Sequence, residues 1–68
     1  MQYSVTIHVI NPEGEFHENV QTVNSRSPVE AEIKALEQAG VWELPDEFTF
    51  MTHHIYNDTK RKYEGIQI

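Results

Sequence analysis

The chain has 68 residues, no cysteine and a formal net charge of −6 at pH 7. A chain this short forms one small domain, residues 1–68, that buries only about 60% of the surface of its unfolded state. The lack of cysteine excludes disulfides and thiolate metal sites within it, and the acidic balance disfavours direct binding to nucleic-acid phosphates. The first eleven residues hold neither a basic region nor a long apolar run. We therefore expect no signal peptide, no membrane span and a cytoplasmic location.

Residues 2–24 have the pattern of a β-hairpin. The apolar residues of the first strand alternate with polar ones, with the period of two that is typical of a half-buried strand: Tyr3, Val5, Ile7 and Val9. The run Asn11-Pro12-Glu13-Gly14 predicts a tight turn, because proline presets φ at the second turn position and Asn and Gly suit its ends.

A two-residue loop between Asn11 and Gly14 fixes a register for this hairpin. We expect facing residues to be Val9 with Phe16, Val5 with Val20, and His8 with His17. The first two pairs then lie on an apolar face that a helix covers, and the histidine pair lies on the polar face. Glu18, opposite Ile7, is the one residue that does not fit this pattern.

A helix is predicted over residues 28–39. Ser27 is a preferred N-cap, Pro28 suits the first helical position, and Glu30 completes a capping box. Gly40 stands where a left-handed residue ends a helix.

One stripe of this helix is expected to face the core. On a helical wheel Val29, Ile33 and Leu36 form an apolar stripe, which Ala35 and Ala39 widen. Acidic residues point away from it, and Glu30 is spaced to pair with Lys34 at i,i+4.

Residues 40–47 are expected to be a connector, because Pro45 excludes a helix that continues through it. Residues 48–68 alternate again and predict a second hairpin with a turn after Asn57. In the register that unites the strongest apolar residues, one face carries Phe48, Phe50, Ile66 and Ile68, and the opposite face carries Met51, Ile55 and Tyr63.

The predicted element order is ββαββ. It favours an α+β fold with a four-stranded, mainly antiparallel sheet and one helix packed on one face. The order of the strands in the sheet does not follow from the sequence. One face of such a sheet is left open to water or to a partner.

The residue pattern gives little support for catalysis, a metal or any other cofactor. His8 and His17, facing each other, are weak candidates for metal ligation, because zinc sites in proteins have three or four protein ligands. His53 and His54 are adjacent in a strand and are expected to point to opposite faces. There is no glycine-rich phosphate loop and no metalloprotease or hydrolase motif, so we expect no enzymatic activity.

These observations favour a non-enzymatic, acidic module that binds another protein, as an accessory inhibitor or modulator of a larger one. The expected contact residues are Met51, His53, Ile55 and Tyr63 on the open sheet face, Trp42 after the helix, and Glu30 and Glu37, whose charge would attract a basic partner. The size, acidity and layout of the chain resemble those of accessory proteins of phages and other mobile elements. No sequence motif supports this resemblance.

Two alternatives stay open. One is a structural homo-oligomer, such as a homodimer, that pairs through the open sheet face, since exposed apolar groups there mark an interaction surface. The other is a nucleic-acid mimic that binds a basic nucleic-acid-binding protein. The sequence identifies neither the partner nor the oligomeric state, and the acidic surface is equally compatible with a purely solubilising role.

Overall fold

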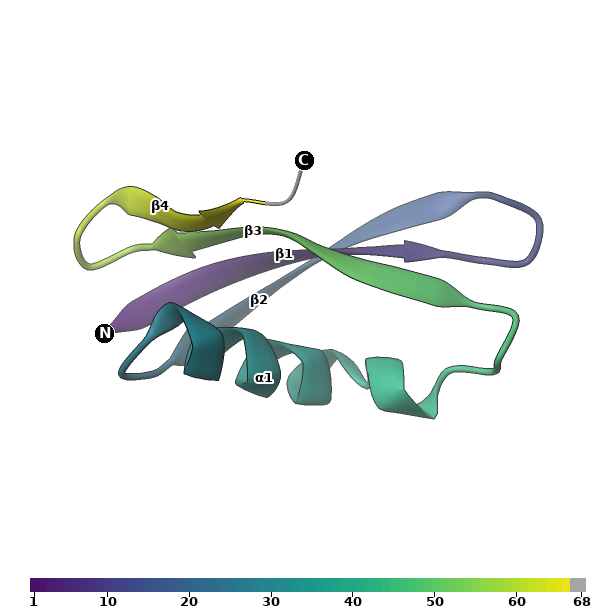
Figure 1. Cartoon of the computed structure of the whole chain (residues 1–68), viewed down its shortest axis with the longest axis horizontal. Helices are drawn as coiled ribbons and strands as arrows, with labels where there is room; N and C mark the ends of the chain where they lie inside the picture. The colour runs from purple at the N-terminus through teal and green to yellow at the C-terminus, as the bar shows by residue number, and fades with distance from the viewer. Residues whose placement is uncertain (67–68) are drawn as a thin grey trace.

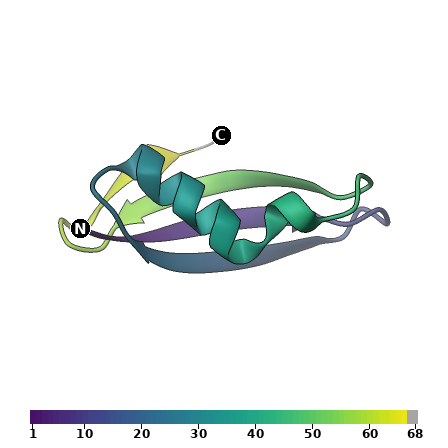
Figure 2. The same cartoon turned by 90° about the horizontal axis from the view of Figure 1, so that it is seen from below.

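The computed structural model describes residues 1–66 and shows four strands and one α-helix. The elements in chain order are β1 (Gln2–Ile10), β2 (Phe16–Asn24), α1 (Pro28–Ala39), the short 3-10 helix η1 (Val41–Glu43), β3 (Thr49–Asn57) and β4 (Lys62–Ile66). All neighbouring strands are antiparallel, in the order β2-β1-β3-β4. The α1 helix runs diagonally across one side of the sheet (Figures 1 and 2). The predicted α+β fold is thus confirmed. We call the side under α1 the covered face and the other side the open face.

The first hairpin has a different register from the one predicted. Ile10 faces Phe16, so the predicted register is wrong by one residue. The Asn11 N–H donates to the Glu15 carbonyl at 2.9 Å, which gives the loop three residues rather than two. Gly14 adopts φ 85°, the left-handed conformation that follows a type I turn in a three-residue hairpin loop.

This shift of one residue exchanges the two faces of β2, because side chains alternate along a strand. Phe16 and Val20 are exposed on the open face instead of buried under the helix. Val23 takes their place in the core. Glu18 now lies opposite His8, so its conflict with an apolar neighbour disappears.

The core lies between α1 and the three strands that it crosses. Its buried apolar residues are Tyr3, Val5, Ile7, Val23, Ala31, Ala35, Leu36, Val41 and Ile55. The largest fully buried apolar side chains all belong to β1, whereas the fully buried helix residues are alanines. The helix therefore approaches the sheet with small side chains, and the strands supply most of the core volume.

The predicted apolar stripe of the helix is correct at Leu36, Ala35 and Ala39 but wrong at its first two positions. Leu36 is buried, but Val29 is 68% exposed and Ile33 is 53% exposed. The reason is the bulk of the strand side chains under the helix, which leaves room for Ala31 and Ala35 and turns the branched residues to the flank.

The ends of α1 follow the local chemistry of the sequence. The Ser27 side chain accepts a hydrogen bond from the Glu30 N–H at 3.2 Å. Gly40 has φ 73°, and its N–H donates back to the Glu37 carbonyl. The Glu30 carboxylate pairs with the Lys34 ammonium at 3.2 Å, as the i,i+4 spacing predicts.

A bulge in β3 decides which residues of the second hairpin reach the core. Thr6 of β1 faces His54, but the next β1 residue faces Thr52, so His53 is an extra residue. Beyond the bulge the faces are exchanged, and Ile55 lies on the covered face, buried in the core. The prediction that Ile55 shares the open face with Met51 and Tyr63 is therefore wrong.

The β3–β4 pairing changes register along its length. Tyr56 faces Tyr63, whereas Ile55 faces Gly65, with an irregularity between these pairs. The predicted even-sum register holds only for the pairs away from the turn. The expectation that Phe50 shares a face with the Ile66 side chain and Ile68 lies outside the described residues.

A cluster of hydrogen-bonded polar side chains connects β4 to β1 and β3. The Tyr3 hydroxyl donates to Glu64 Oε2 at 3.3 Å, and the Asn57 side-chain amide donates to Glu64 Oε1 at 3.1 Å. Asn57 Oδ1 accepts from the Lys60 N–H at 2.9 Å and holds the turn. Burial and the Glu64 carboxylate both raise the pKa of the Tyr3 hydroxyl. Within residues 1–66 every buried side-chain nitrogen or oxygen has a partner.

Candidate functional site

Six rings lie in an unbroken series on the open face. The centroids are separated by 5.0 Å from Phe16 to His8, 4.3 Å from His8 to His53, 4.1 Å from His53 to His54, 5.3 Å from His54 to Tyr63 and 4.9 Å from Tyr63 to Tyr56. We call these residues the ring row. Its members come from all four strands, so the row crosses the whole width of the sheet.

The β3 bulge makes the ring row continuous. His53 and His54 were expected on opposite faces, but the extra residue in β3 lets both rings lie together on the open face. His53 stacks on His8 with an interplanar angle of 20°, while His54 meets Tyr63 edge to face at 65°. A regular strand would have sent one of the two imidazoles to the helix side.

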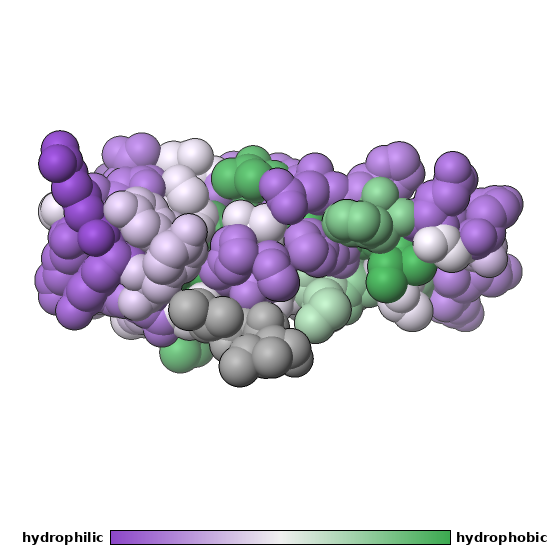
Figure 3. Space-filling model, turned by 90° about the horizontal axis from the view of Figure 1, so that it is seen from above, coloured by the Kyte–Doolittle hydropathy of each residue, from purple (hydrophilic) through white to green (hydrophobic). Residues whose placement is uncertain are grey.

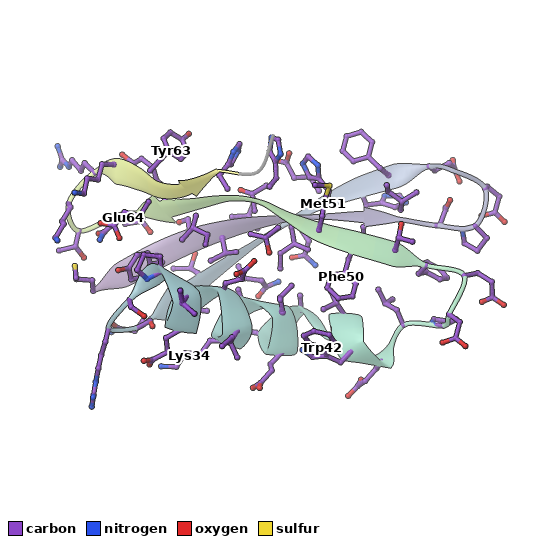
Figure 4. The ribbon with its side chains drawn as sticks, in the orientation of Figure 1. Lys34, Trp42, Phe50, Met51, Tyr63 and Glu64 are labelled. Carbon is purple, nitrogen blue, oxygen red and sulfur yellow. The ribbon has the colours of Figure 1, made fainter. Side chains whose placement is uncertain are left out.

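The ring row forms an exposed surface of ring faces and not a pocket. Tyr63 is 55% exposed and Phe16 is 60% exposed, and Figure 4 shows Tyr63 on the side of the sheet away from the helix. Thr6, below the middle of the row, is buried although it belongs to the open face. Figure 3 shows separate apolar areas among hydrophilic side chains on this face. Such a surface suits flat or cationic groups that stack on rings.

The surroundings of His53 favour its neutral form. Partial burial lowers the pKa of His53, and the neighbouring His54 and His8 rings lower it further, against a smaller opposing effect of Glu18. His53 is therefore uncharged at pH 7. Glu18 Oε2 lies 3.4 Å from His8 Nε2, which places one carboxylate beside the row.

The candidate metal pair is not formed. His8 belongs to the open face, whereas His17 lies opposite Val9 on the other side of the sheet, so the predicted pairing of His8 with His17 is wrong. Among residues 1–66 no group of three or more His, Cys, Asp or Glu side chains is arranged to hold a metal ion.

A second surface feature is an open depression between α1 and β2. It is lined by Thr22, Val23, Asn24, Lys34, Glu37 and Gln38. Gln38 donates to the Gln21 side chain at 2.7 Å across the gap, and Lys34 donates to the Asn24 carbonyl at 2.9 Å. The polar groups here bond to each other, and the shallow shape would leave any ligand largely in water.

The structure separates the predicted contact residues into two groups. Met51, His53 and Tyr63 lie on the open face, together as predicted. Ile55 belongs to the core. Figure 4 shows Trp42 on the helix side, where it meets Phe50 edge to face at 5.3 Å.

The acidic helix residues also lie away from the open face. Glu30 is paired with Lys34, and Glu37 borders the depression beside β2. Both carboxylates are therefore separated from the ring row by the thickness of the sheet, and they can act on a partner there only through the overall field of the molecule.

Four members of the ring row were not predicted from the sequence as partner-contact residues. The sequence suggested only metal binding for His8 and a separate face for His54. It placed Phe16 under the helix, together with Tyr56, which alternates in step with Phe48 and Phe50. The sequence did not decide the face of Phe16, because Asn-Pro-Glu-Gly suits a two-residue and a three-residue loop alike. No sequence signal marked the bulge that brings in His54.

No protein-family model matches the chain, and no curated protein or solved structure is significantly similar to it. In the part of the chain that the structure describes, no helix is long and apolar enough to cross a membrane. The function must therefore be argued from the surface of the protein itself.

Proposed function

We propose that this protein is a non-enzymatic module that binds another protein through the ring row on its open sheet face. The observation that carries the proposal is the unbroken series of six rings across all four strands, with Phe16 and Tyr63 more than half exposed. Exposed aromatic side chains are enriched at the centres of protein interfaces because they bury a large area with few rotatable bonds. Exposed Met51 adds an adaptable apolar group on the same face.

The partner surface is proposed to be basic and rich in arginine. The chain carries a net charge of −6, which raises the local concentration of cationic partners. A guanidinium group stacks on ring faces, and Glu18 beside His8 offers a carboxylate to a group bound at that end of the row. The neutral His53 does not repel such a group at pH 7.

The test compares two pairs of exposed apolar residues on opposite sides of the protein. Met51→Ser with Tyr63→Ser alters the ring-row side, and Val29→Ser with Ile33→Ser alters the exposed flank of α1. All four side chains are more than a third exposed, so neither double variant should change stability greatly.

The probe is a hexa-arginine peptide titrated into the isotope-labelled full chain and followed by NMR. We expect shifts centred on His8, His53 and Tyr63, weakened in the ring-row variant and retained in the α1 variant. A hexa-lysine peptide should shift the same resonances less, because ammonium stacks on rings less well than guanidinium. Equal binding by both variants would refute the ring row as the contact surface.

The same variants discriminate the alternatives. A dimer that persists on dilution and that Met51→Ser with Tyr63→Ser converts to monomer would replace partner binding with self-association, as light scattering would show. Binding that is abolished by salt and is lost with Glu30→Gln and Glu37→Gln, but not with the ring-row variant, would instead indicate mimicry of nucleic acid by the acidic helix.

A further inference from the structure

The outer edge of β2 presents unpaired backbone groups. β2 is an end strand of the sheet. Met1 and Ser25 exchange backbone hydrogen bonds with each other, and Asn11 bonds to Glu15, so odd-numbered residues of β2 direct their backbone groups toward β1. Even-numbered residues from 16 to 24 therefore direct theirs outward.

The helix occupies one half of this edge. The Lys34 ammonium donates to the Asn24 carbonyl at 2.9 Å, and the Gln38 side-chain amide lies 3.4 Å from the Thr22 carbonyl. These two side chains hydrogen-bond the last outward carbonyls of β2. In the other half, Phe16–Val20, no hydrogen bond within residues 1–66 reaches the outward groups of residues 16, 18 and 20.

This open half has almost none of the features that keep edge strands from pairing. It contains no proline, lysine or arginine, and its pairing with β1 has no bulge. Phe16 and Val20 are both more than half exposed on the open face, and Glu18 between them carries the only formal charge of the segment. The edge thus offers an incoming strand one negative position, Glu18, with one apolar position on each side of it, Phe16 and Val20.

Charge decides what strand fits this template. If a second copy paired antiparallel through the same edge with Phe16 opposite Val20, Glu18 would face Glu18 of the other chain, between two molecules of net charge −6. Like charges directly opposite each other destabilise a strand pair. A different strand with lysine or arginine opposite Glu18, and apolar residues two positions to each side, removes this conflict.

We propose that the β2 edge at Phe16, Glu18 and Val20 binds an extended basic segment of another protein as a fifth strand of the sheet. Backbone hydrogen bonds to the three outward residues would hold the segment, and the alternating side chains would select it. This goes beyond the proposed function, since it needs the backbone edge, whereas the ring row needs exposed rings. The two share Phe16, so one partner chain could occupy both surfaces.

The test uses a peptide of sequence Thr-Val-Thr-Lys-Thr-Val-Thr with blocked ends, and the matched peptide with Glu in place of Lys. We expect the Lys peptide to slow hydrogen exchange of the Glu18 and Val20 amides in the full chain. The Glu peptide should bind roughly fivefold more weakly, as expected for exchanging an attractive for a repulsive cross-strand pair. Equal affinity of the two peptides would overturn the proposed selectivity.

Backbone pairing is tested without altering the protein. N-methylation of the lysine amide of the peptide blocks one edge through which its backbone can pair, and we expect roughly tenfold weaker binding from the lost hydrogen bond and the added clash. A peptide methylated at the neighbouring threonine, whose amide points the other way, serves as the control. If neither methyl group matters, strand addition is refuted.

Variants of the protein separate this proposal from the ring row. Val20→Pro removes an outward N–H that the fold does not use, and should abolish protection of Glu18, whereas Val20→Thr keeps the N–H and should retain it. Met51→Ser with Tyr63→Ser should leave the peptide's binding unchanged. Peptide shifts confined to Tyr63 and His53 would overturn edge binding and leave the ring-row proposal intact, while growing aggregates in light scattering would show that the occupant is another copy of this chain.

Discussion

The covered face and the open face of the sheet differ in composition, although the same strands supply the side chains of both. On the covered face β1 contributes Tyr3, Val5 and Ile7, all fully buried, against the alanines of α1. On the open face the row of rings exposes Phe16 of β2 at one end and Tyr63 of β4 near the other. The fold of this small domain depends on the covered face, so the open face is free to carry a function.

The largest effect is expected from the covered face. Ile7→Ala should lower the free energy of unfolding by about 2–5 kcal/mol, because it leaves a cavity under the helix. Ile10→Ala on the same strand, on the open face, should cost much less. Urea denaturation measures both, and equal losses would contradict the division of roles between the faces.

The helix offers a second contrast between buried and exposed positions. Ala35 is fully buried against the sheet, so Ala35→Leu should overpack the core and cost about 1–3 kcal/mol. Ile33→Gln, two residues earlier on the same helix, should change stability by about 0.5 kcal/mol or less because Ile33 is exposed. A stabilising Ala35→Leu would mean that the helix lies farther from the sheet than the structure shows.

The polar cluster at the end of the sheet should matter nearly as much as the apolar core. Asn57→Ala removes the amide that bonds Glu64 and the oxygen that accepts from Lys60. Asn57 is fully buried, and removing its two part-buried hydrogen bonds should cost about 1–3 kcal/mol. Asn24→Ala, at an exposed position of β2, is the control, and thermal unfolding of both variants gives the comparison.

The parts of the fold that follow from local chemistry were predictable. Ser27 and Gly40 fix the ends of α1 through bonds to residues within one turn, as predicted. The predicted capping box is only half formed, because the Glu30 carboxylate pairs with Lys34 instead of bonding back to Ser27. The hairpin register was not predictable in this way. The letters Asn-Pro-Glu-Gly suit a two-residue and a three-residue loop alike, and the left-handed Gly14 that selects the longer one is itself a consequence of the pairing.

The candidate site was harder to predict because it depends on contacts between distant segments. His8 stacks on His53 only because β1 lies beside β3 in the sheet, and strand order does not follow from the sequence. The bulge at His53 likewise depends on the pairing of these two strands, with Ile55 drawn into the core on one side of it. Met51 lies on the face that alternation within its strand predicts. Tyr63 also lies on the open face, but only because the β3 bulge and the irregularity in the β3–β4 pairing offset each other.

The smallest effect is a pH dependence that belongs to the open face. Because the pKa of His53 is lowered in the folded protein, the unfolded chain binds a proton at this residue more readily as the pH falls. The contribution of His53 to the free energy of unfolding is therefore constant above about pH 6.5, the usual pKa of histidine. It declines as the pH falls from there toward the lowered pKa of His53 in the folded protein. Unfolding midpoints measured from pH 8 to pH 5 should show this decline, and His53→Gln should reduce it. Since a protonated His53 would also repel a cationic group, binding of the hexa-arginine peptide should weaken over the same range. A pH profile that His53→Gln leaves unchanged would assign the effect to another group and remove the argument that a neutral His53 favours a basic partner.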